Sequence, residues 1–218
     1  MNTAPFWRLA VDIERCTGCH ACSVACKAEY QIPLGHFRTK VYYRDIGQFP
    51  LVKRHFLPAF CMQCEAADCV SACPEKAIKR GADGIVRINQ ELCLGQKGKC
   101  GHPCVRACAY GALSAATDGL ADKCDFCSDR LAASLQPSCV TACPTESLIF
   151  GNTNDPDSPI SRFLNSPRGQ SAMPVDRGGK PQVLYRAANA QAVARVPSGR
   201  PHDPRSYEID QWVLEAKP

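Results

Sequence analysis

Sixteen cysteines in a chain of 218 residues fall into four groups of four, and no cysteine is left over. The groups are Cys16, Cys19, Cys22 and Cys26; Cys61, Cys64, Cys69 and Cys73; Cys93, Cys100, Cys104 and Cys108; and Cys124, Cys127, Cys139 and Cys143. Every group closes with two cysteines separated by three residues. The first group has the C-x2-C-x2-C-x3-C spacing with which bacterial ferredoxins bind 4Fe–4S clusters. Four such groups in one chain favour iron–sulfur chemistry.

Two other cysteine chemistries match this spacing less well. Disulfides stabilise small secreted chains, usually shorter than this one, and they give no reason for a repeated C-x3-C ending. Structural zinc usually takes two C-x2-C pairs for each ion, often with histidine, whereas the five histidines here do not recur at a fixed offset. A structural zinc protein with all-thiolate sites is therefore the alternative from a different functional class.

The spacing has a physical reason. Three thiolates on one tight loop reach three corners of a cube, and Gly18 supplies backbone freedom inside the first loop. The fourth thiolate follows the loop and faces a neighbouring cluster. Pro74 and Pro144 follow the second and fourth groups, where a residue without an N–H turns the chain away from the site. Thiolates are also the ligands that soft, sulfide-rich iron prefers.

The elements that position these loops form an internal repeat. Short strands are predicted over 7–13 and 84–89, and short helices over 21–30 and 132–140, with a longer linker over 30–59. Because the cysteine groups begin at 16, 61, 93 and 124, a unit of strand, loop, helix and strand recurs along the chain. Each unit is too small to bury a core alone, so the clusters are expected to serve as the core.

Composition and charge exclude several classes of protein. The chain has no apolar run of about 18 residues that would span a membrane, and no export signal is visible at its start. Neither a nucleophile–base pair nor a phosphate-binding glycine loop is present, so no catalytic residue is predicted. The net charge of +5 gives no strong nucleic-acid signal. Four oxidised clusters, at about −2 each with their thiolates, would bring this charge to about −3.

Basic residues near the cysteine groups have two interpretations. Lys97, Lys99, Arg106 and Lys123 either raise the local reduction potentials or bind an acidic partner, or they are ordinary solvated charges. The sequence leaves these readings open.

The segment 151–218 contains no cysteine and is rich in turn-forming residues around 152–159 and 197–201. We expect it to form an extended tail with little core of its own. Apolar and aromatic residues at 183–185 and 209–214 remain as anchors, so the tail is predicted to dock on a partner subunit.

With four groups in this order, the chain resembles the iron–sulfur subunits of the dimethyl sulfoxide reductase family of molybdopterin oxidoreductases, and most of all the tetrathionate, polysulfide and arsenate reductase type. The resemblance covers about residues 7–187 and rests on the segments 16–27 (CTGCHACSVACK), 56–65 (FLPAFCMQCE), 121–127 (ADKCDFC), 139–144 (CVTACP), 154–158 (NDPDS) and 180–181 (KP).

The resemblance implies an α+β fold of tandem bacterial-ferredoxin-like domains, that is, two pseudo-symmetric double-cluster units with an extended C-terminal tail. Residues 6–59 plus 112–150 would form the first unit, residues 60–111 a second unit inserted in it, and residues 151–218 the tail. It further implies crosswise ligation of four 4Fe–4S clusters: Cys16, Cys19, Cys22 and Cys143; Cys26, Cys124, Cys127 and Cys139; Cys61, Cys64, Cys69 and Cys108; and Cys73, Cys93, Cys100 and Cys104.

The resemblance also implies partners. A large molybdenum or tungsten bis-pterin subunit would carry out catalysis, and this chain would relay electrons to a quinone-linked membrane anchor or a soluble carrier. The expected location is a peripheral position in a membrane-associated complex, on the periplasmic face after export with a partner, with the cytoplasmic face as the alternative. A subunit of a formate dehydrogenase or hydrogenase-type complex, and a free polyferredoxin, are the alternatives within redox biology.

The third cysteine group departs from the family pattern C-x2-C-x2-C-x3-C-P. Four residues, 96–99, are inserted before Cys100, one more residue stands beside Pro103, and Ala109 replaces the usual proline. His102 lies inside this loop and is expected to form a hydrogen bond rather than to bind metal.

Overall fold

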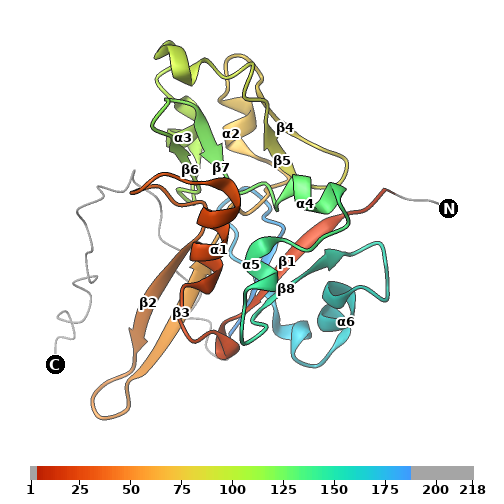
Figure 1. Ribbon diagram of the computed structural model, residues 1–218. Helices are drawn as coiled ribbons and strands as arrows, with labels where there is room; N and C mark the ends of the chain where they lie inside the picture. The colour runs from red at the N-terminus through yellow and green to blue at the C-terminus, as the bar shows by residue number, and fades with distance from the viewer. Residues whose placement is uncertain (1–3, 188–218) are drawn as a thin grey trace.

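A four-stranded sheet forms the centre of the molecule, which the computed structural model describes over residues 4–187 (Figure 1). Its strands lie in the order β8 (Leu148–Asn152), β1 (Trp7–Asp12), β10 (Val183–Arg186) and β9 (Met173–Pro174). Strand β1 pairs antiparallel with β8 and parallel with β10. Because β1 has a neighbour on each side, Leu9 and Val11 are buried almost completely. The strand predicted over 7–13 is confirmed over 7–12.

Three two-stranded hairpins surround this sheet. They are β2 (Lys40–Ile46) with β3 (Lys53–Ala59), β4 (Ile78–Arg80) with β5 (Val86–Ile88), and β6 (Leu113–Ala115) with β7 (Ala121–Lys123). The first hairpin extends away from the body of the molecule in Figure 1. Residues 30–59, which the sequence predicts as a linker, thus contain a regular seven-residue ladder.

The helices are short, and most of them carry cysteines or flank them. They are α1 (Ala21–Tyr30), α2 (Asp68–Ser71), α3 (Pro103–Ala107), α4 (Ser128–Ala132), α5 (Ser138–Thr141) and α6 (Pro159–Asn165), with the 3-10 turns η1 (Ile13–Arg15), η2 (Leu94–Lys97) and η3 (Gly169–Ser171). The helix predicted over 21–30 is confirmed. The helix predicted over 132–140 is wrong, because α4 ends at Ala132 and α5 begins only after Pro137. A proline disfavours helical backbone in the residue before it.

The border between two of the hydrophobic cores does not coincide with the predicted domain boundary. One contains Leu9, Phe126 and Phe150 of the central sheet region, and the other contains Cys69 and Cys104 of the upper region in Figure 1. Leu113 and Ala121 belong to this second core, although the predicted boundary at 111/112 would place them in the first unit. The reason is local: hairpin β6–β7 covers α3 as hairpin β4–β5 covers α2.

Residues 151–187 differ from the extended tail that the sequence predicts. Helix α6 packs against β8 through Ile160, and β10 inserts into the central sheet beside β1. Tyr185 is buried, and its hydroxyl donates a hydrogen bond to the Pro58 carbonyl oxygen at 2.9 Å. This part of the chain therefore completes the core of its own subunit. Residues 188–218, the rest of the predicted tail, lie outside the described residues.

An ion-pair network attaches the C-terminal segment to β1. The Asp12 carboxylate is 1% exposed and accepts hydrogen bonds from Arg168 at 2.7 Å and from Arg186 at 3.0 Å. The Arg186 side chain is itself largely buried. A buried carboxylate needs such partners, because its desolvation costs several kcal/mol.

Replacing Asp12 by asparagine tests this attachment. Loss of the charge leaves Arg186 without its counter-ion, and we expect a cost of about 3 kcal/mol, at the low end for a buried pair because Arg168 is half exposed. For a chain of this size the thermal midpoint of the anaerobic holoprotein would fall by roughly 6–12 °C. Asp45→Asn is the control, since Asp45 pairs with the exposed Arg54 and should leave the midpoint nearly unchanged. Equal midpoints for both variants would contradict the assignment.

Candidate metal centres

Three cavities in the structure are each lined by four cysteines. The first is lined by Cys26, Cys124, Cys127 and Cys139, the second by Cys61, Cys64, Cys69 and Cys108, and the third by Cys73, Cys93, Cys100 and Cys104. The space between atoms in them is about 350, 430 and 350 Å³, including the parts open to solvent. Each set of four joins cysteines from two separate stretches of the chain.

The remaining four cysteines also lie near one another. Cys16 interacts electrostatically with Cys143 and Cys19, and Cys22 interacts with Cys16 and Cys143. Cys19 is the one cysteine of the sixteen that is exposed. Thus the structure brings Cys143 to the first cysteine loop, although it lies 117 positions after Cys26.

Paired helices produce this crosswise arrangement. On α1, Cys22 and Cys26 are four residues apart and therefore share one face. Helix α5 packs against α1, and it carries Cys139 with Cys143 four residues later. Cys22 lies near Cys143, and Cys26 lines a cavity with Cys139, so the helices run in opposite directions past each other. Helices α2 and α3 make the corresponding contact in the other half.

A turn with the same hydrogen bond follows the last cysteine of three groups. Three positions after Cys73, Cys108 and Cys143, the backbone N–H donates to the cysteine carbonyl oxygen at 3.1, 3.1 and 3.2 Å. The donors are Lys76, Gly111 and Glu146, with φ of 51°, 56° and 49°. The turn thus forms after Ala109 as well as after Pro74 and Pro144, so the missing proline of the third group does not change the local backbone.

The third cysteine group accommodates its insertion outside the site. The turn η2 and Gly98, with φ of 62°, carry the chain away between Cys93 and Cys100. Both cysteines still line the third cavity. The hydrogen bond expected of His102 is present, since its Nε2 lies 2.6 Å from the Gly119 carbonyl oxygen.

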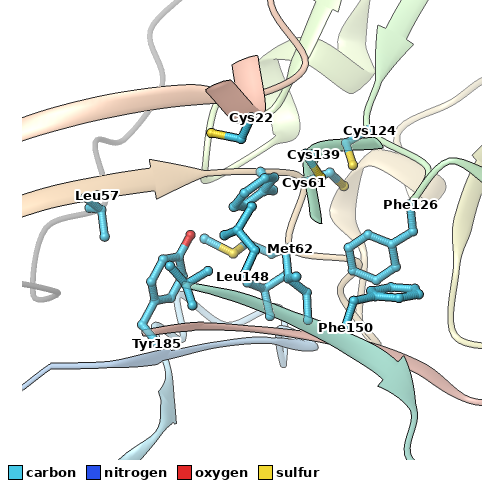
Figure 2. Close-up of a cluster of buried hydrophobic side chains, with 14 of the residues drawn as sticks. Cys22, Leu57, Cys61, Met62, Cys124, Phe126, Cys139, Leu148, Phe150 and Tyr185 are labelled. Atoms are coloured by element: carbon cyan, nitrogen blue, oxygen red, sulfur yellow. The ribbon is translucent and has the colours of Figure 1, made fainter. Parts of the chain in front are cut away.

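Burial makes most of these thiols hard to ionise. It raises the pKa of Cys22 and Cys26 to about 11 and that of Cys64 to about 12, and it places the pKa of Cys124 and Cys139 well above the ordinary value. Figure 2 shows Cys22, Cys124 and Cys139 at one side of the aromatic core. Metal binding must displace these protons, so a bound cation is what makes four buried thiolates tolerable.

The pKa of the Cys143 thiol is shifted in the opposite direction, below its ordinary value. Burial raises the pKa of its thiol, but hydrogen bonds from Ser147, Thr145 and the backbone outweigh burial and lower the pKa overall. The Ser147 N–H lies 3.3 Å from the Cys143 sulfur, and the Ala112 N–H lies 3.4 Å from the sulfur of Cys108. Such hydrogen bonds to sulfur are one of the means by which proteins set cluster potentials.

A charged group that the sequence did not single out closes the first cavity. Arg38 lies 3.8 Å above the ring of Tyr30, and its Nε donates to Asp122 at 2.9 Å. Tyr30 in turn donates to Asp125 at 3.1 Å. No spacing rule links Arg38 to residues more than 80 positions away, so only the fold reveals this network.

The four thiols of each cavity surround a space instead of converging on a point. Within residues 4–187, no three His, Cys, Asp or Glu side chains come close enough to hold a single metal ion. In the same part of the chain, no helix is long and apolar enough to cross a membrane.

Comparison with known proteins identifies the type of subunit. Residues 52–153 match the model of the 4Fe-4S dicluster domain family. A polysulfide reductase polypeptide of Wolinella succinogenes is 41% identical over 159 residues, which cover 71% of this chain and 81% of that protein. The chain belongs to the iron–sulfur subunits of the dimethyl sulfoxide reductase family.

Other members of this iron–sulfur subunit family match to a similar extent. The thiosulfate reductase electron transfer subunit of Salmonella typhi is 42% identical over 158 residues, or 70% of this chain and 78% of the relative. A tetrathionate reductase subunit of Salmonella typhimurium is 36% identical over 184 residues, or 82% and 71%. This iron–sulfur subunit is therefore an electron-transfer protein with a ferredoxin-like, cluster-binding domain.

The close packing of Gly18 against Phe56 allows the structure of the first cysteine loop to be tested by substitution. Gly18 has φ of +70°, and a Cβ there would overlap the ring of Phe56 on β3. Gly35 is a matched control, because its φ is +81° but a Cβ would meet nothing within 4 Å. Both alanine variants bear the cost of left-handed backbone, about 1–2 kcal/mol.

Gly18→Ala should cost a further 1–3 kcal/mol or so, because Phe56 must leave the loop. We expect a lower thermal midpoint and less bound iron for Gly18→Ala than for Gly35→Ala, measured on anaerobically purified protein. Identical iron content and midpoint in the two variants would show that the contact with Phe56 is unimportant.

Proposed function

We propose that this chain binds four 4Fe–4S clusters and relays electrons for a molybdopterin reductase complex. The observation that carries the proposal is that each of three cavities is lined by four cysteines and by no more than four. The proposed ligand sets are Cys16, Cys19, Cys22 and Cys143; Cys26, Cys124, Cys127 and Cys139; Cys61, Cys64, Cys69 and Cys108; and Cys73, Cys93, Cys100 and Cys104.

The residues around the cavities fit such a group. Four thiols form the donor set that iron–sulfur clusters use. The buried Thr39 hydroxyl lines the first cavity, and its hydrogen bond to the Cys26 sulfur counteracts the effect of burial on the pKa of that thiol. The buried Ser23 hydroxyl forms the corresponding hydrogen bond to the sulfur of Cys22. Thiolate and sulfide sulfur would accept a hydrogen bond from each.

The chain itself positions the cysteines and keeps water away. When bound, the clusters supply one-electron oxidation and reduction. Phe60, Phe126 and Phe150 form apolar walls of the first cavity, while Met62 and Tyr110 line the second. Low polarity and hydrogen bonds to sulfur are the features through which a protein sets cluster potentials.

Electrostatic effects between cysteines of different sets, and a shared core, support a linear order of the four sites. Cys22 of the first proposed set acts electrostatically on Cys139 of the second, and Cys61 of the third acts on Cys124. Cys69 of the third set and Cys104 of the fourth share one hydrophobic core. We infer that electrons enter or leave at the first set, since Cys19 is exposed there.

The proposed partners follow from the relatives. Their names make them components of reductases of polysulfide, tetrathionate and selenate, which implies a catalytic partner. We propose that a molybdenum or tungsten bis-pterin subunit is that partner, and that a membrane anchor or soluble carrier exchanges electrons at the other end. Peripheral placement at the membrane belongs to this proposal, and the periplasmic face stays a prediction.

The division into two double-cluster units is also proposed. The α1–α5 contact supports a unit built from residues 6–59 and 112–150, and the α2–α3 contact supports an inserted unit over 60–111. Hairpin β6–β7 packs with the inserted unit.

Reductase names among the relatives favour a subunit of a reductase complex over a subunit of a formate dehydrogenase or hydrogenase and over a free polyferredoxin.

Serine variants of cysteines on one helix test the crosswise ligation. Cys22 and Cys26 are neighbours on α1 but belong to different proposed sets. Cys22→Ser should alter the same paramagnetic signal of the reduced protein as Cys143→Ser, whereas Cys26→Ser should alter the signal that Cys139→Ser alters. Electron paramagnetic resonance of anaerobic holoprotein, with the iron content of each variant, provides the measurement.

Sequential ligation would contradict the proposal, and it would appear as one common altered signal for Cys22→Ser and Cys26→Ser. The unmodified protein should contain roughly sixteen irons per chain, four for each cluster. A colourless protein with stoichiometric zinc and no iron would establish the zinc alternative instead.

A further inference from the structure

Lys123 is a buried cation between two of the proposed sites. It ends strand β7, one residue before Cys124, and it is 3% exposed. Its Nζ donates to the carbonyl oxygen of Cys124 at 2.7 Å and to that of Val86. Within residues 4–187, none of the salt bridges includes Lys123. Both of its hydrogen-bond partners are neutral carbonyl groups.

The two carbonyls belong to different sites. Cys124 is in the second proposed set, and Val86 lines the cavity of the third. The Lys123 ammonium also acts on Cys69 of the third set, where it opposes the effect of burial that raises the pKa of that thiol to about 12. Lys123 is therefore hydrogen-bonded to the backbone of a cysteine of the second set and acts electrostatically on a thiol of the third.

A buried ammonium needs a compensating negative charge. Removing such a group from water costs several kcal/mol, and neutral carbonyls compensate only part of that cost. With the second and third sets filled, each site carries a net charge of about −2. Thus the anionic partner of Lys123 is the pair of sites on either side of it, not a carboxylate.

Gln63 accompanies Lys123 at the same junction. It is 0% exposed, its Nε2 donates to the Cys124 carbonyl oxygen at 2.8 Å, and its Oε1 accepts from the Val86 N–H at 2.8 Å. Lys123, which is charged, and Gln63, which is neutral, therefore both hydrogen-bond to Cys124 and Val86, and together they form a bridge between these two residues. Variants of the two side chains can separate the effect of the charge of this bridge from the effect of its hydrogen bonds.

We propose that Lys123 is a positioning and tuning residue whose buried charge raises the reduction potentials of the two sites that flank it. The inference rests on the proposed function. Reduction adds negative charge to a site, and a fixed positive charge nearby in a medium of low polarity stabilises that added charge. The sites of the first and fourth sets, which Lys123 does not contact, are unaffected.

Lys123→Gln is the main test, because glutamine keeps hydrogen-bond donors for both carbonyls but removes the charge. The full chain is purified anaerobically as holoprotein, and each signal is titrated potentiometrically by electron paramagnetic resonance. We expect two of the four midpoint potentials to fall by at least a tenfold change in the reduction equilibrium, which is about 59 mV for one electron. Lys123→Arg, which keeps the charge, should restore most of this shift.

Gln63→Met is the matched control. It removes the neutral half of the bridge without a change of charge, so all four potentials should shift by less than half of the Lys123→Gln effect. Equal shifts in both variants would overturn the proposal, because they would assign the effect to bridge geometry. Unchanged potentials in Lys123→Gln would overturn it as well.

A further variant covers the case in which Lys123→Gln does not retain its iron. Gln63→Glu adds a negative charge beside Lys123 in a side chain of the same size, and the same two potentials should fall. Four unshifted potentials in that variant would overturn the role of Lys123. A protein without any paramagnetic signal would instead contradict the proposed function itself.

Discussion

The structure depends on one constraint, which is that sulfur ligands from distant parts of the chain must meet inside a protein interior. A thiolate is costly to bury alone, and the raised pKa values of Cys26 and Cys124 express that cost. In the proposed sites, iron bound to four such sulfurs would turn this cost into a gain, since binding free energy becomes folding free energy.

The cysteine spacing allowed much of the local structure to be predicted, because ligand geometry and backbone geometry are coupled there. Helix α1 and strand β1 were predicted within one residue, and iron–sulfur chemistry followed from the repeated C-x3-C ending. The resemblance to a known family supplied the grouping of Cys26 with Cys124, Cys127 and Cys139. Those four line one cavity of the structure.

The remainder of the fold was not readable in the sequence for identifiable reasons. The β2–β3 hairpin mixes charged and aromatic residues, and β3 buries His55 together with the consecutive Leu57 and Pro58, so its alternation is weak. Strand β10 is only four residues long, and its partner β1 lies more than 170 positions earlier. The networks of Arg38 and of Lys123 with Gln63 are also non-local, since Arg38 reaches Asp122 across 84 positions and Gln63 reaches Cys124 across 61, and no local pattern predicts such contacts.

The sheet pairing also determines when the fold can close. Strand β1 stands near the start of the chain, while its parallel partner β10 is the last element described. All sixteen cysteines precede β10. During synthesis from the N-terminus every thiol therefore emerges from the ribosome before the central sheet is complete, and contacts of such long sequence separation form slowly. Until β10 is added, β1 lacks one of its two neighbours in the central sheet.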